Sequence, residues 1–285
     1  MSYKITKKID LDSMDYLVEV EAPEVAERFI PGQFVMLMTH EQGERVPMSV
    51  MKAEDGKITM FIRKLGKTSK NLRDNFDTFY NVIGPLGNGI EIKKYGTIVV
   101  VSDAVCGQAE NYAFCQALSK VEGNNIISMQ TFPNHKEIYP EDVLTKEHVN
   151  THIITTEDGS YGEPGSYLDV LQKMVEEDGL KVDYVLGGGK LPTLKKLSAF
   201  LKKHEIPNEL TVRQMMVDGS GMCGACRLYV NGEMKLACID GPMFDGRYVD
   251  WDTAIKRYGM FKREERVADL DYQCQQKGGC QSWQK

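Results

Sequence analysis

Residues 216–242 read MVDGSGMCGACRLYVNGEMKLACIDGP, a glycine-rich stretch that holds three of the seven cysteines of this 285-residue chain. Asp218, Cys223, Cys226 and Cys238 stand as D-x4-C-x2-C-x11-C. Plant-type [2Fe–2S] proteins begin their ligand set with C-x4-C-x2-C and supply a fourth cysteine later in the chain. The spacing therefore predicts a [2Fe–2S] loop in which Asp218 stands at the first cysteine position.

The glycines of this stretch give the spacing a mechanical reason. They allow a tight loop whose amides can approach sulfide, and a hairpin then returns Cys238 from the far side. The same four side chains could instead form a structural zinc site with three thiolates and a carboxylate. Within the iron–sulfur interpretation, Asp218 is either the fourth ligand or a residue at the border of the site.

Composition excludes several classes of protein. Lys and Arg number 35 against 41 Asp and Glu, a net charge of −6 that disfavours nucleic acid as a partner. No run approaches the roughly 20 apolar residues of a membrane span, and the first ten residues lack the apolar core of a secretory signal. An odd cysteine count fits a secreted disulfide framework poorly. We expect a cytoplasmic protein that contacts neither nucleic acid nor membrane.

The chain divides into three segments by pattern. Residues 1–94 contain alternating strand-like runs parted by turn residues, which predicts a small antiparallel barrel. Those runs are Tyr16–Val20, Gln33–Met38 and Lys57–Arg63, and one short helix is expected within residues 67–76.

Residues 95–210 alternate between strand and helix, which is typical of an α/β domain with a parallel sheet. The expected strands are 97–101, 125–131, 151–155 and 182–186, and the expected helices are 109–120, 167–176 and 191–203. Residues 211–285 form the cysteine-bearing segment, followed by one charged amphipathic helix over 252–271 and a polar tail.

A second set of motifs lies in the barrel segment. Arg45-Val-Pro-Met-Ser49 is followed by Arg63-Lys-Leu-Gly-Lys-Thr-Ser69 and by Gly84-Pro-Leu-Gly87. An arginine can pair bidentately with a pyrophosphate, and a turn entering a helix offers amides and hydroxyls to phosphates. Taken singly, these are a loop arginine and an ordinary helix cap. Their order on one β-domain favours a phosphate-bearing cofactor.

These motifs together resemble the ferredoxin–NADP reductase superfamily, whose barrel binds flavin through an arginine–serine motif and a later glycine turn. Up to about residue 270 the chain looks like the small subunit of the electron-bifurcating NADH-dependent ferredoxin:NADP oxidoreductases. The stretches 216–226, 237–246 and 249–251 carry the most specific match. In that branch an aspartate is part of the cluster motif and is the fourth ligand.

The resemblance implies fold, cofactors and partners. It implies a six-stranded FAD-binding barrel over 1–94, an NAD(P)-binding-like domain over 95–210 and a [2Fe–2S] domain over 211–285. It implies a larger flavin and iron–sulfur partner subunit, and ferredoxin as a partner of the complex. The implied cluster ligands are Asp218, Cys223, Cys226 and Cys238. The implied FAD-binding residues are Arg45, Pro47, Met48, Ser49, Ile62, Arg63, Gly66, Lys67, Thr68 and Ser69, with Ser49 near the reactive edge of the isoalloxazine.

The nucleotide segment departs from this family. Its relatives place a G-G-G-x-G turn after the first strand, where this chain reads Ser102-Asp-Ala-Val-Cys-Gly107. Loss of the glycines removes close backbone approach to a ligand, and Asp103 adds a negative charge there. Either the site takes NAD(H) in altered form, or this is a paralogue that serves another electron donor or acceptor. The motif T-x-D-G-S-x-G is kept at residues 156–162.

Two further functions stay open. One is the electron-transfer subunit of dihydroorotate dehydrogenase, although that branch has four cysteine ligands and Asp218 speaks against it. The other is a non-catalytic redox-sensing module. Outside the cluster motif, Cys106 is either a thiol near the flavin or a small buried side chain, Cys115 is expected in the core, and Cys274 and Cys280 fall in the tail. The five histidines form no pair at metal spacing.

Overall fold

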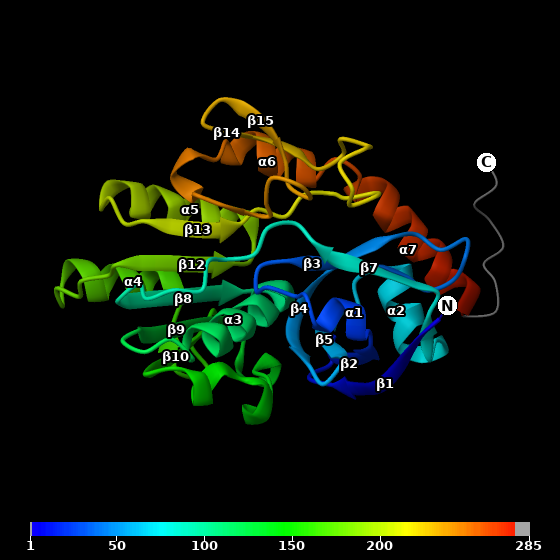
Figure 1. Cartoon of the computed structure of the whole chain (residues 1–285), viewed down its shortest axis with the longest axis horizontal. Helices are drawn as coiled ribbons and strands as arrows, with labels where there is room; N and C mark the ends of the chain where they lie inside the picture. The colour runs from blue at the N-terminus through cyan, green and yellow to red at the C-terminus, as the bar shows by residue number, and fades with distance from the viewer. Residues whose placement is uncertain (1, 277–285) are drawn as a thin grey trace.

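The structure, a computed structural model, describes residues 2–276, and its first unit is an antiparallel barrel (Figure 1). The strand order is β6-β1-β2-β5-β4-β3-β7. Its strands are β1 (Tyr3–Asp10), β2 (Asp15–Glu21), β3 (Phe34–Met38), β4 (Val46–Glu54), β5 (Lys57–Arg63), β6 (Thr78–Phe79) and β7 (Asn81–Leu86), with helices α1 (Pro23–Ala26) and α2 (Lys67–Asn75). The predicted barrel is confirmed; the strand beyond the expected six is the two-residue β6, which pairs with the start of β1.

Side-chain alternation gives the barrel two apolar faces. Tyr16, Val18 and Val20 of β2 are fully buried in one cluster, because residues two apart on a strand share a face. Leu17 points the other way and joins a separate apolar cluster with Tyr112 of the following α/β unit. The outer face of the barrel is therefore the surface on which that unit packs.

The second unit is a mainly parallel sheet with the order β11-β10-β9-β8-β12-β13-β16. Its strands are β8 (Thr97–Asp103), β9 (Asn125–Phe132), β10 (Thr151–Thr156), β11 (Glu163–Pro164), β12 (Tyr184–Gly188), β13 (Asn208–Thr211) and β16 (Met243–Phe244). Its helices are α3 (Val105–Leu118), α4 (Tyr167–Glu176) and α5 (Leu191–Lys203), with short 3-10 turns η1 (His135–Glu137), η2 (Glu141–Val143) and η3 (Thr145–His148). The strand order reverses beside β8, which is where open α/β sheets form their binding crevice.

Helix α3 begins four residues earlier than predicted. The expectation was a loop up to residue 108, but a single residue, Ala104, turns the chain with a φ of 69° and ψ of 154°. The helix then starts directly at Val105. A one-residue reversal of this kind is a glycine conformation, which is why it was not foreseen at an alanine.

The third unit is built on the hairpin β14 (Arg227–Val230) and β15 (Glu233–Leu236). After it, β16 returns to the large sheet and pairs antiparallel with β13, and η4 (Gly246–Tyr248) leads into α6 (Trp251–Tyr258). Trp251 is buried and its indole donates to the Gly246 carbonyl at 2.9 Å. The cysteine segment is thus fastened to the α/β sheet at both ends of the hairpin.

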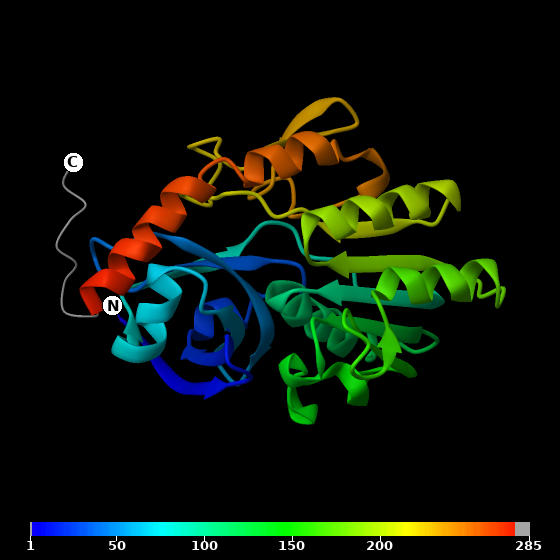
Figure 2. The same ribbon diagram turned by 180° about the vertical axis from the view of Figure 1, so that it is seen from behind.

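The single helix predicted over 252–271 is wrong. The chain forms α6 and a separate α7 (Lys262–Gln276), broken at Gly259, a residue with low helix propensity. Both views show α7 leaving α6 and running along the barrel beside α2 (Figure 2). Lys70 of α2 and Asp269 of α7 form an ion pair at 2.6 Å. The break lets α7 reach the barrel, so the C-terminal helix joins the third unit to the first.

Within the part of the chain that the structure describes, no helix is long and apolar enough to cross a membrane.

Candidate functional site

The arginine–serine motif occupies the start of β4 and the loop before it. Pro47, Met48 and Ser49 lie on β4, opposite Met36, Val35 and Phe34 of β3. Arg45 is exposed, and its Nε contacts the sulfur of Met38 at 3.4 Å. No carboxylate of the described chain pairs with Arg45, so its guanidinium is available to an anion.

The predicted phosphate turn caps helix α2. Gly66 is the N-cap residue, and the Ser69 hydroxyl accepts the amides of Leu65 and Gly66 at 3.0 and 3.2 Å. The Thr68 hydroxyl bonds to Glu44, next to Arg45 in sequence. Arg45 and the start of α2 therefore flank one place on the barrel, as a pyrophosphate site requires, while Ser69 is already engaged as a cap. Lys67 is exposed.

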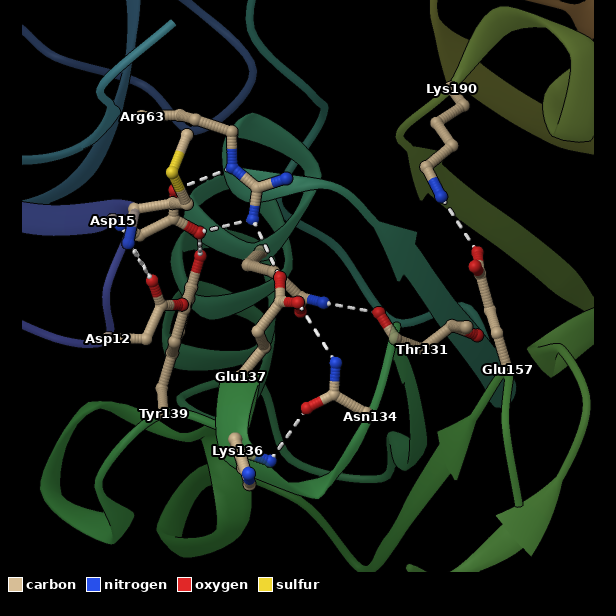
Figure 3. Close-up of polar contacts among 12 residues, drawn as sticks. Asp12, Asp15, Arg63, Thr131, Asn134, Lys136, Glu137, Tyr139, Glu157 and Lys190 are labelled. Carbon is tan, nitrogen blue, oxygen red and sulfur yellow. Dashed lines mark hydrogen bonds and ion pairs between the residues drawn. The ribbon is translucent and has the colours of Figure 1, made fainter. Parts of the chain in front are cut away.

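Arg63 and Ile62 do not join this face. The Ile62 side chain is buried in the barrel core. Arg63 donates to both carboxylate oxygens of Asp15 at 2.7 and 2.8 Å and approaches Glu137 at 3.4 Å (Figure 3). Two carboxylates neutralise its charge, so Arg63 serves as a tie between the barrel and the α/β unit. Both side chains are engaged within the protein, and a flavin contact of either residue stays a prediction.

Asp15 is the centre of that tie, and sequence reasoning missed it. Its carboxylate is fully buried and also accepts the Tyr139 hydroxyl at 2.7 Å. Burial and the neighbouring Asp15 raise the pKa of Tyr139, while the bond to Asp15 raises the pKa of Arg63. The available signal is an acidic residue at the first position of a buried strand.

The carboxyl ends of β8 and β12 hold a second buried carboxylate, Asp103. It accepts the Lys190 amide at 2.6 Å and the Thr193 hydroxyl at 2.8 Å, both from the first turn of α5. Burial raises the pKa of Asp103 above its usual range. The start of α5 is thus occupied by a side chain of the protein itself.

The nearby crevice at the start of α3 is small. A cavity of about 20 Å³ is lined by side chains that include Arg63, Thr131, Glu137 and Lys190, and Lys190 pairs with Glu157 at 2.7 Å on its rim (Figure 3). This volume suits one water molecule. The surviving Gly107 has a packing role, because a Cβ there would lie 2.3 Å from the Gly188 carbonyl oxygen.

A third buried carboxylate, Glu110 of α3, touches the flavin motif. The Ser49 hydroxyl donates to Glu110 Oε1 at 2.7 Å. Burial is the largest influence on this carboxyl and raises its pKa to about 7, against smaller lowering effects from Ser49 and Thr211. Glu110 belongs to no motif of the sequence; the signal for it is a charged residue on a helix that is buried on nearly every side.

The predicted cluster ligands share one loop. Cys226 and Cys238 are buried with their sulfurs 3.3 Å apart, and Cys223 is exposed. Amides point at sulfur, from Ala225 to Cys223 at 3.4 Å and from Cys238 to Cys226 at 3.5 Å. Thiols that accept amide hydrogens are the donor chemistry of an iron–sulfur site, so these residues fit the predicted group.

Asp218 lies at the mouth of the same loop. Its two oxygens accept the amides of Ser220 and Cys223 at 2.9 and 2.8 Å, and these bonds hold the pKa of its carboxyl below the usual range. Across residues 2–276, no three His, Cys, Asp or Glu side chains already converge as metal ligands. The four-residue ligand set therefore stays a prediction.

The cluster loop packs against the barrel beside the flavin motif. Gly219 has a φ of 74°, and a Cβ there would lie 2.7 Å from the Met36 side chain. Met36 is the strand partner of Pro47. The segment after β7 also reaches this unit, because the Asn88 amide donates to the Gly241 carbonyl at 2.6 Å. Only strand β3 separates the two motifs.

The remaining motifs have structural roles. The T-x-D-G-S-x-G run is a turn in which Thr156 bonds to the backbone of Tyr161. Cys115 is buried, and burial raises the pKa of its thiol. Cys106 is partly buried in an apolar cluster, Cys274 lies on α7, and Cys280 lies outside the described residues.

Comparison with known proteins identifies the C-terminal unit. Residues 213–250 match the family model described as the iron-sulfur cluster binding domain of dihydroorotate dehydrogenase B. That range contains Asp218 and the three cysteines of its motif. The prediction of an iron–sulfur domain is confirmed.

Whole-chain relatives extend the match. A Thermotoga maritima protein described as a dihydroorotate dehydrogenase B (NAD(+)), electron transfer subunit homolog is 35% identical over 271 residues, 93% of each chain. The corresponding electron transfer subunit of Desulforamulus reducens is 26% identical over 83% of this chain and 93% of its own. A chain in the solved NADH-dependent reduced ferredoxin-NADP oxidoreductase, a structure reported for flavin-based electron bifurcation, is 33% identical with a TM-score of 0.85. It covers 93% of this chain and 95% of its own.

A more distant structure supports the fold alone. A ferredoxin reductase of carbazole 1,9a-dioxygenase has a TM-score of 0.58 at 15% identity, over 74% of this chain and 68% of its own. The predicted ferredoxin-reductase-like fold is thus confirmed. The whole-chain relatives also confirm an electron-transfer subunit of an oxidoreductase, with FAD and an iron–sulfur cluster as cofactors and a larger catalytic subunit as partner. This chain belongs to the family of dihydroorotate dehydrogenase B electron transfer subunits and their homologues.

Proposed function

We propose that this chain moves electrons between an FAD on the β4–α2 face of the barrel and a [2Fe–2S] cluster in the 218–238 loop. The observation that carries the proposal is the packing of Gly219 against Met36, which puts the cluster loop one strand from Pro47. The cofactors supply the redox chemistry, and the protein supplies position and potential.

The residues assigned to each cofactor follow from their contacts. The free guanidinium of Arg45 would bind the pyrophosphate, helped by the amides of Lys67 and Thr68 and the hydroxyl of Thr68. Pro47, Met48 and Ser49 shape the flavin pocket. Cys223, Cys226, Cys238 and Asp218 would ligate the cluster.

The larger subunit is proposed to dock over the cluster loop. Val217, Met222 and Ile239 are 57, 89 and 48% exposed, and Ile239 packs on Gly221 of the loop. Exposed apolar side chains gathered around a redox centre mark a protein contact. Ferredoxin exchange and electron bifurcation belong to that larger subunit in this proposal. Five cysteines of the described chain, at positions 106, 115, 223, 226 and 238, are free thiols, which fits a reducing compartment. We place the complex in the cytoplasm.

Nicotinamide use by this subunit is proposed to be altered or lost. Asp103 fills the start of α5, and the crevice at α3 holds about 20 Å³. An anionic dinucleotide would have to displace a buried carboxylate. Anaerobic stopped-flow mixing with NADH and NADPH tests this point: we expect no direct bleaching of the flavin, and bleaching within the turnover time would contradict it.

The core of the proposal is tested by a visible spectrum and metal analysis of anaerobically purified protein. We expect flavin bands and about two irons per chain; zinc without iron overturns the assignment. Asp218→Cys is expected to keep the cluster and shift its potential. Asp218→Ala is compared with Asp240→Ala, whose carboxylate also accepts an amide, from Leu236. If both alanine variants keep the native signal and potential, Asp218 is no ligand.

The relatives named for dihydroorotate dehydrogenase B favour a second candidate function, transfer of electrons for dihydroorotate oxidation. Affinity purification of the tagged chain under anaerobic conditions, followed by mass spectrometry, separates the two. We expect a partner with its own iron–sulfur motifs; a dihydroorotate dehydrogenase catalytic subunit in stoichiometric amount would establish the second function instead.

A further inference from the structure

Glu110 is a carboxylate with one oxygen engaged and the other alone. Its side chain is 4% exposed. Oε1 accepts the Ser49 hydroxyl at 2.7 Å, whereas Oε2 has no hydrogen-bond partner within the described chain. An ionised carboxylate left unpaired inside a protein is costly. A buried, unpaired carboxylate lowers stability, so its presence points to a role in function. The elements that contact Glu110 indicate which role that is.

Glu110 lies where three elements meet. It projects from α3 to β4 of the barrel through Ser49 and to the end of β12, where a Cβ at Gly188 would lie 2.0 Å from Oε2. Within the described chain, the hydrogen bond from Ser49 joins this carboxyl to the flavin motif. The Thr211 hydroxyl of β13, which also contacts the Met243 sulfur, lies near enough to lower the pKa of Glu110. Glu110 is therefore the buried ionisable group of the α/β unit that touches this motif.

Other charged groups on the packed elements face elsewhere. None contributes appreciably to the pKa of Glu110, which is set by burial and by the hydroxyls of Ser49 and Thr211. The groups engaged elsewhere are Asp103 with Lys190 and Thr193, Lys52 with Glu54, Arg63 with Asp15, Lys57 with Glu19, Tyr184 with Glu209, and His148 with Tyr112. Arg213, which follows β13, donates to the Gly189 carbonyl instead. Within the described chain, Glu110 is therefore the titratable group of these elements that bonds to Ser49.

We propose that Glu110 is a positioning residue of the flavin site, which orients the Ser49 hydroxyl and takes up a proton when an electron pair reaches the flavin. The proposal rests on the proposed placement of FAD beside Ser49. It assigns a function to a residue that belongs to neither cofactor motif.

The charge balance defines the step. Two electrons would add two negative charges to the site, and a flavin bound there would supply the electron-accepting ring, with uptake of one proton that balances one of the two charges. Glu110 neutralises the other: its carboxylate binds one proton from solvent, and it returns that proton when the electron pair leaves for the cluster. The Ser49 hydroxyl keeps its own proton throughout. The electrons come from the electron-transfer activity itself, so no further reactant is required.

Burial prepares Glu110 for this exchange. A pKa of about 7 leaves the carboxyl partly ionised at neutral pH, where a negative charge arriving nearby shifts it towards the acid. A solvent-exposed carboxyl would stay ionised at neutral pH even when a negative charge arrived nearby. The unpaired Oε2 is the atom that binds the proton, because Oε1 is held by Ser49.

The test is the pH dependence of the flavin midpoint potential in the purified holoprotein. With Glu110, one extra proton per electron pair is taken up above about pH 7, so the slope of potential against pH should double there. Glu110→Gln keeps the size and the Ser49 contact but cannot ionise, and its slope should stay single. Glu54→Gln is the matched control, since Glu54 also joins the barrel to α3, through Gln116 at 2.8 Å, but at the surface. It should behave like the native protein.

A second variant and a flavin-free measurement complete the test. Ser49→Ala removes a bond that lowers the pKa of Glu110, so the break in slope should move to higher pH. In flavin-free protein, Glu110→Gln should abolish a proton-linked step in unfolding near pH 7. A doubled slope that persists in Glu110→Gln overturns the proposal while leaving the FAD placement intact. Unchanged flavin binding and potential in both Ser49→Ala and Arg45→Ala overturn the FAD placement, and this proposal with it.

Discussion

The barrel meets the rest of the chain along two seams of opposite chemistry. The polar seam, towards the α/β unit, consists of Asp15, Arg63 and Tyr139 with the pair Ser49 and Glu110. The glycine seam, towards the cluster unit, consists of Gly87, Asn88, Gly219 and Gly241, where backbone and small residues touch. Buried ionisable groups stabilise the polar seam, whereas close packing of backbone at glycines stabilises the glycine seam.

The difference follows from what each seam separates. Buried charges respond to protons and to electrons nearby, so the polar seam can follow the redox state of the flavin. A seam of glycines has no titratable group and allows close backbone approach, which keeps two redox centres near each other at any pH. The predictions below test whether the seams differ in this way.

The largest effect is expected for Asp15→Ala. Removing this carboxylate leaves the Arg63 guanidinium and the Tyr139 hydroxyl without their shared partner inside the polar seam. Breaking a buried pair on one side costs about 4 kcal/mol of unfolding free energy, measurable by urea denaturation. Asp10→Ala, which breaks an exposed pair with Arg73, should cost less than 1 kcal/mol. If the two variants lose the same unfolding free energy, the buried ion pairs of the polar seam stabilise the protein no more than an exposed pair does.

The glycine seam is tested by Gly87→Ala. Gly87 has a φ of 73°, and a Cβ there would lie 2.6 Å from the Gly241 carbonyl oxygen and 2.8 Å from Pro242. We expect a loss of about 3 kcal/mol, from strain and from backbone displacement, together with a lower iron content after purification.

Gly232→Ala is the matched control for this change. Gly232 has a similar φ of 77°, but nothing lies within 4 Å of the added Cβ. Its cost should be the conformational part alone, about 1 kcal/mol, with iron content unchanged. A Gly87→Ala variant no worse than this control would show that the close approach is unimportant.

Sequence patterns predicted the regular elements well where local forces decide. The bounds of β5, α4 and α5 agree with the predicted runs, because apolar periodicity and caps act over a few residues. The start of α3 and the break between α6 and α7 were missed, since they depend on one strained alanine and on the docking of α7 against the barrel. Local sequence patterns predict neither the strained conformation of Ala104 nor the docking of α7.

The residues of the site also divide into those that local sequence predicts and those that it does not. The cluster loop and the Arg45–Ser49 motif were visible because their residues are close in sequence. Glu110 lies 61 residues from Ser49, and Tyr139 lies 124 residues from Asp15. Those contacts exist only once the α/β unit packs on the barrel. Arg63 stands within a phosphate-like motif, and its side chain pairs with Asp15 in the polar seam, a contact that proximity in sequence does not predict.

The pH dependence of stability distinguishes the seams without any cofactor. Because the folded pKa of Glu110 lies near 7, above the usual 4.5, the native state binds an extra proton between these values. Its contribution is complete below about pH 4.5 and is lost as the pH rises through about 7, on the order of 3 kcal/mol in total. The native profile minus that of Glu110→Gln should show this fall. A flat difference would mean that Glu110 titrates as a carboxyl in water does.

The smallest effect is expected for Ala104→Gly, the reverse of the change made at Gly87. Ala104 holds a φ of 69° and a ψ of 154° at the start of α3, a conformation that glycine adopts freely and other residues adopt with strain. Relief of that strain exceeds the extra entropy of glycine in the unfolded chain, so the variant should be more stable by about 1 kcal/mol. Asn231→Gly, at a φ of 51° in a hairpin turn, should change stability by less than half as much, because asparagine tolerates that region. Ala104 lines the crevice together with Asp15, Arg63 and Tyr139. A loss of stability in Ala104→Gly would therefore mean that the alanine methyl packs productively there, and that shape also matters beside the polar seam.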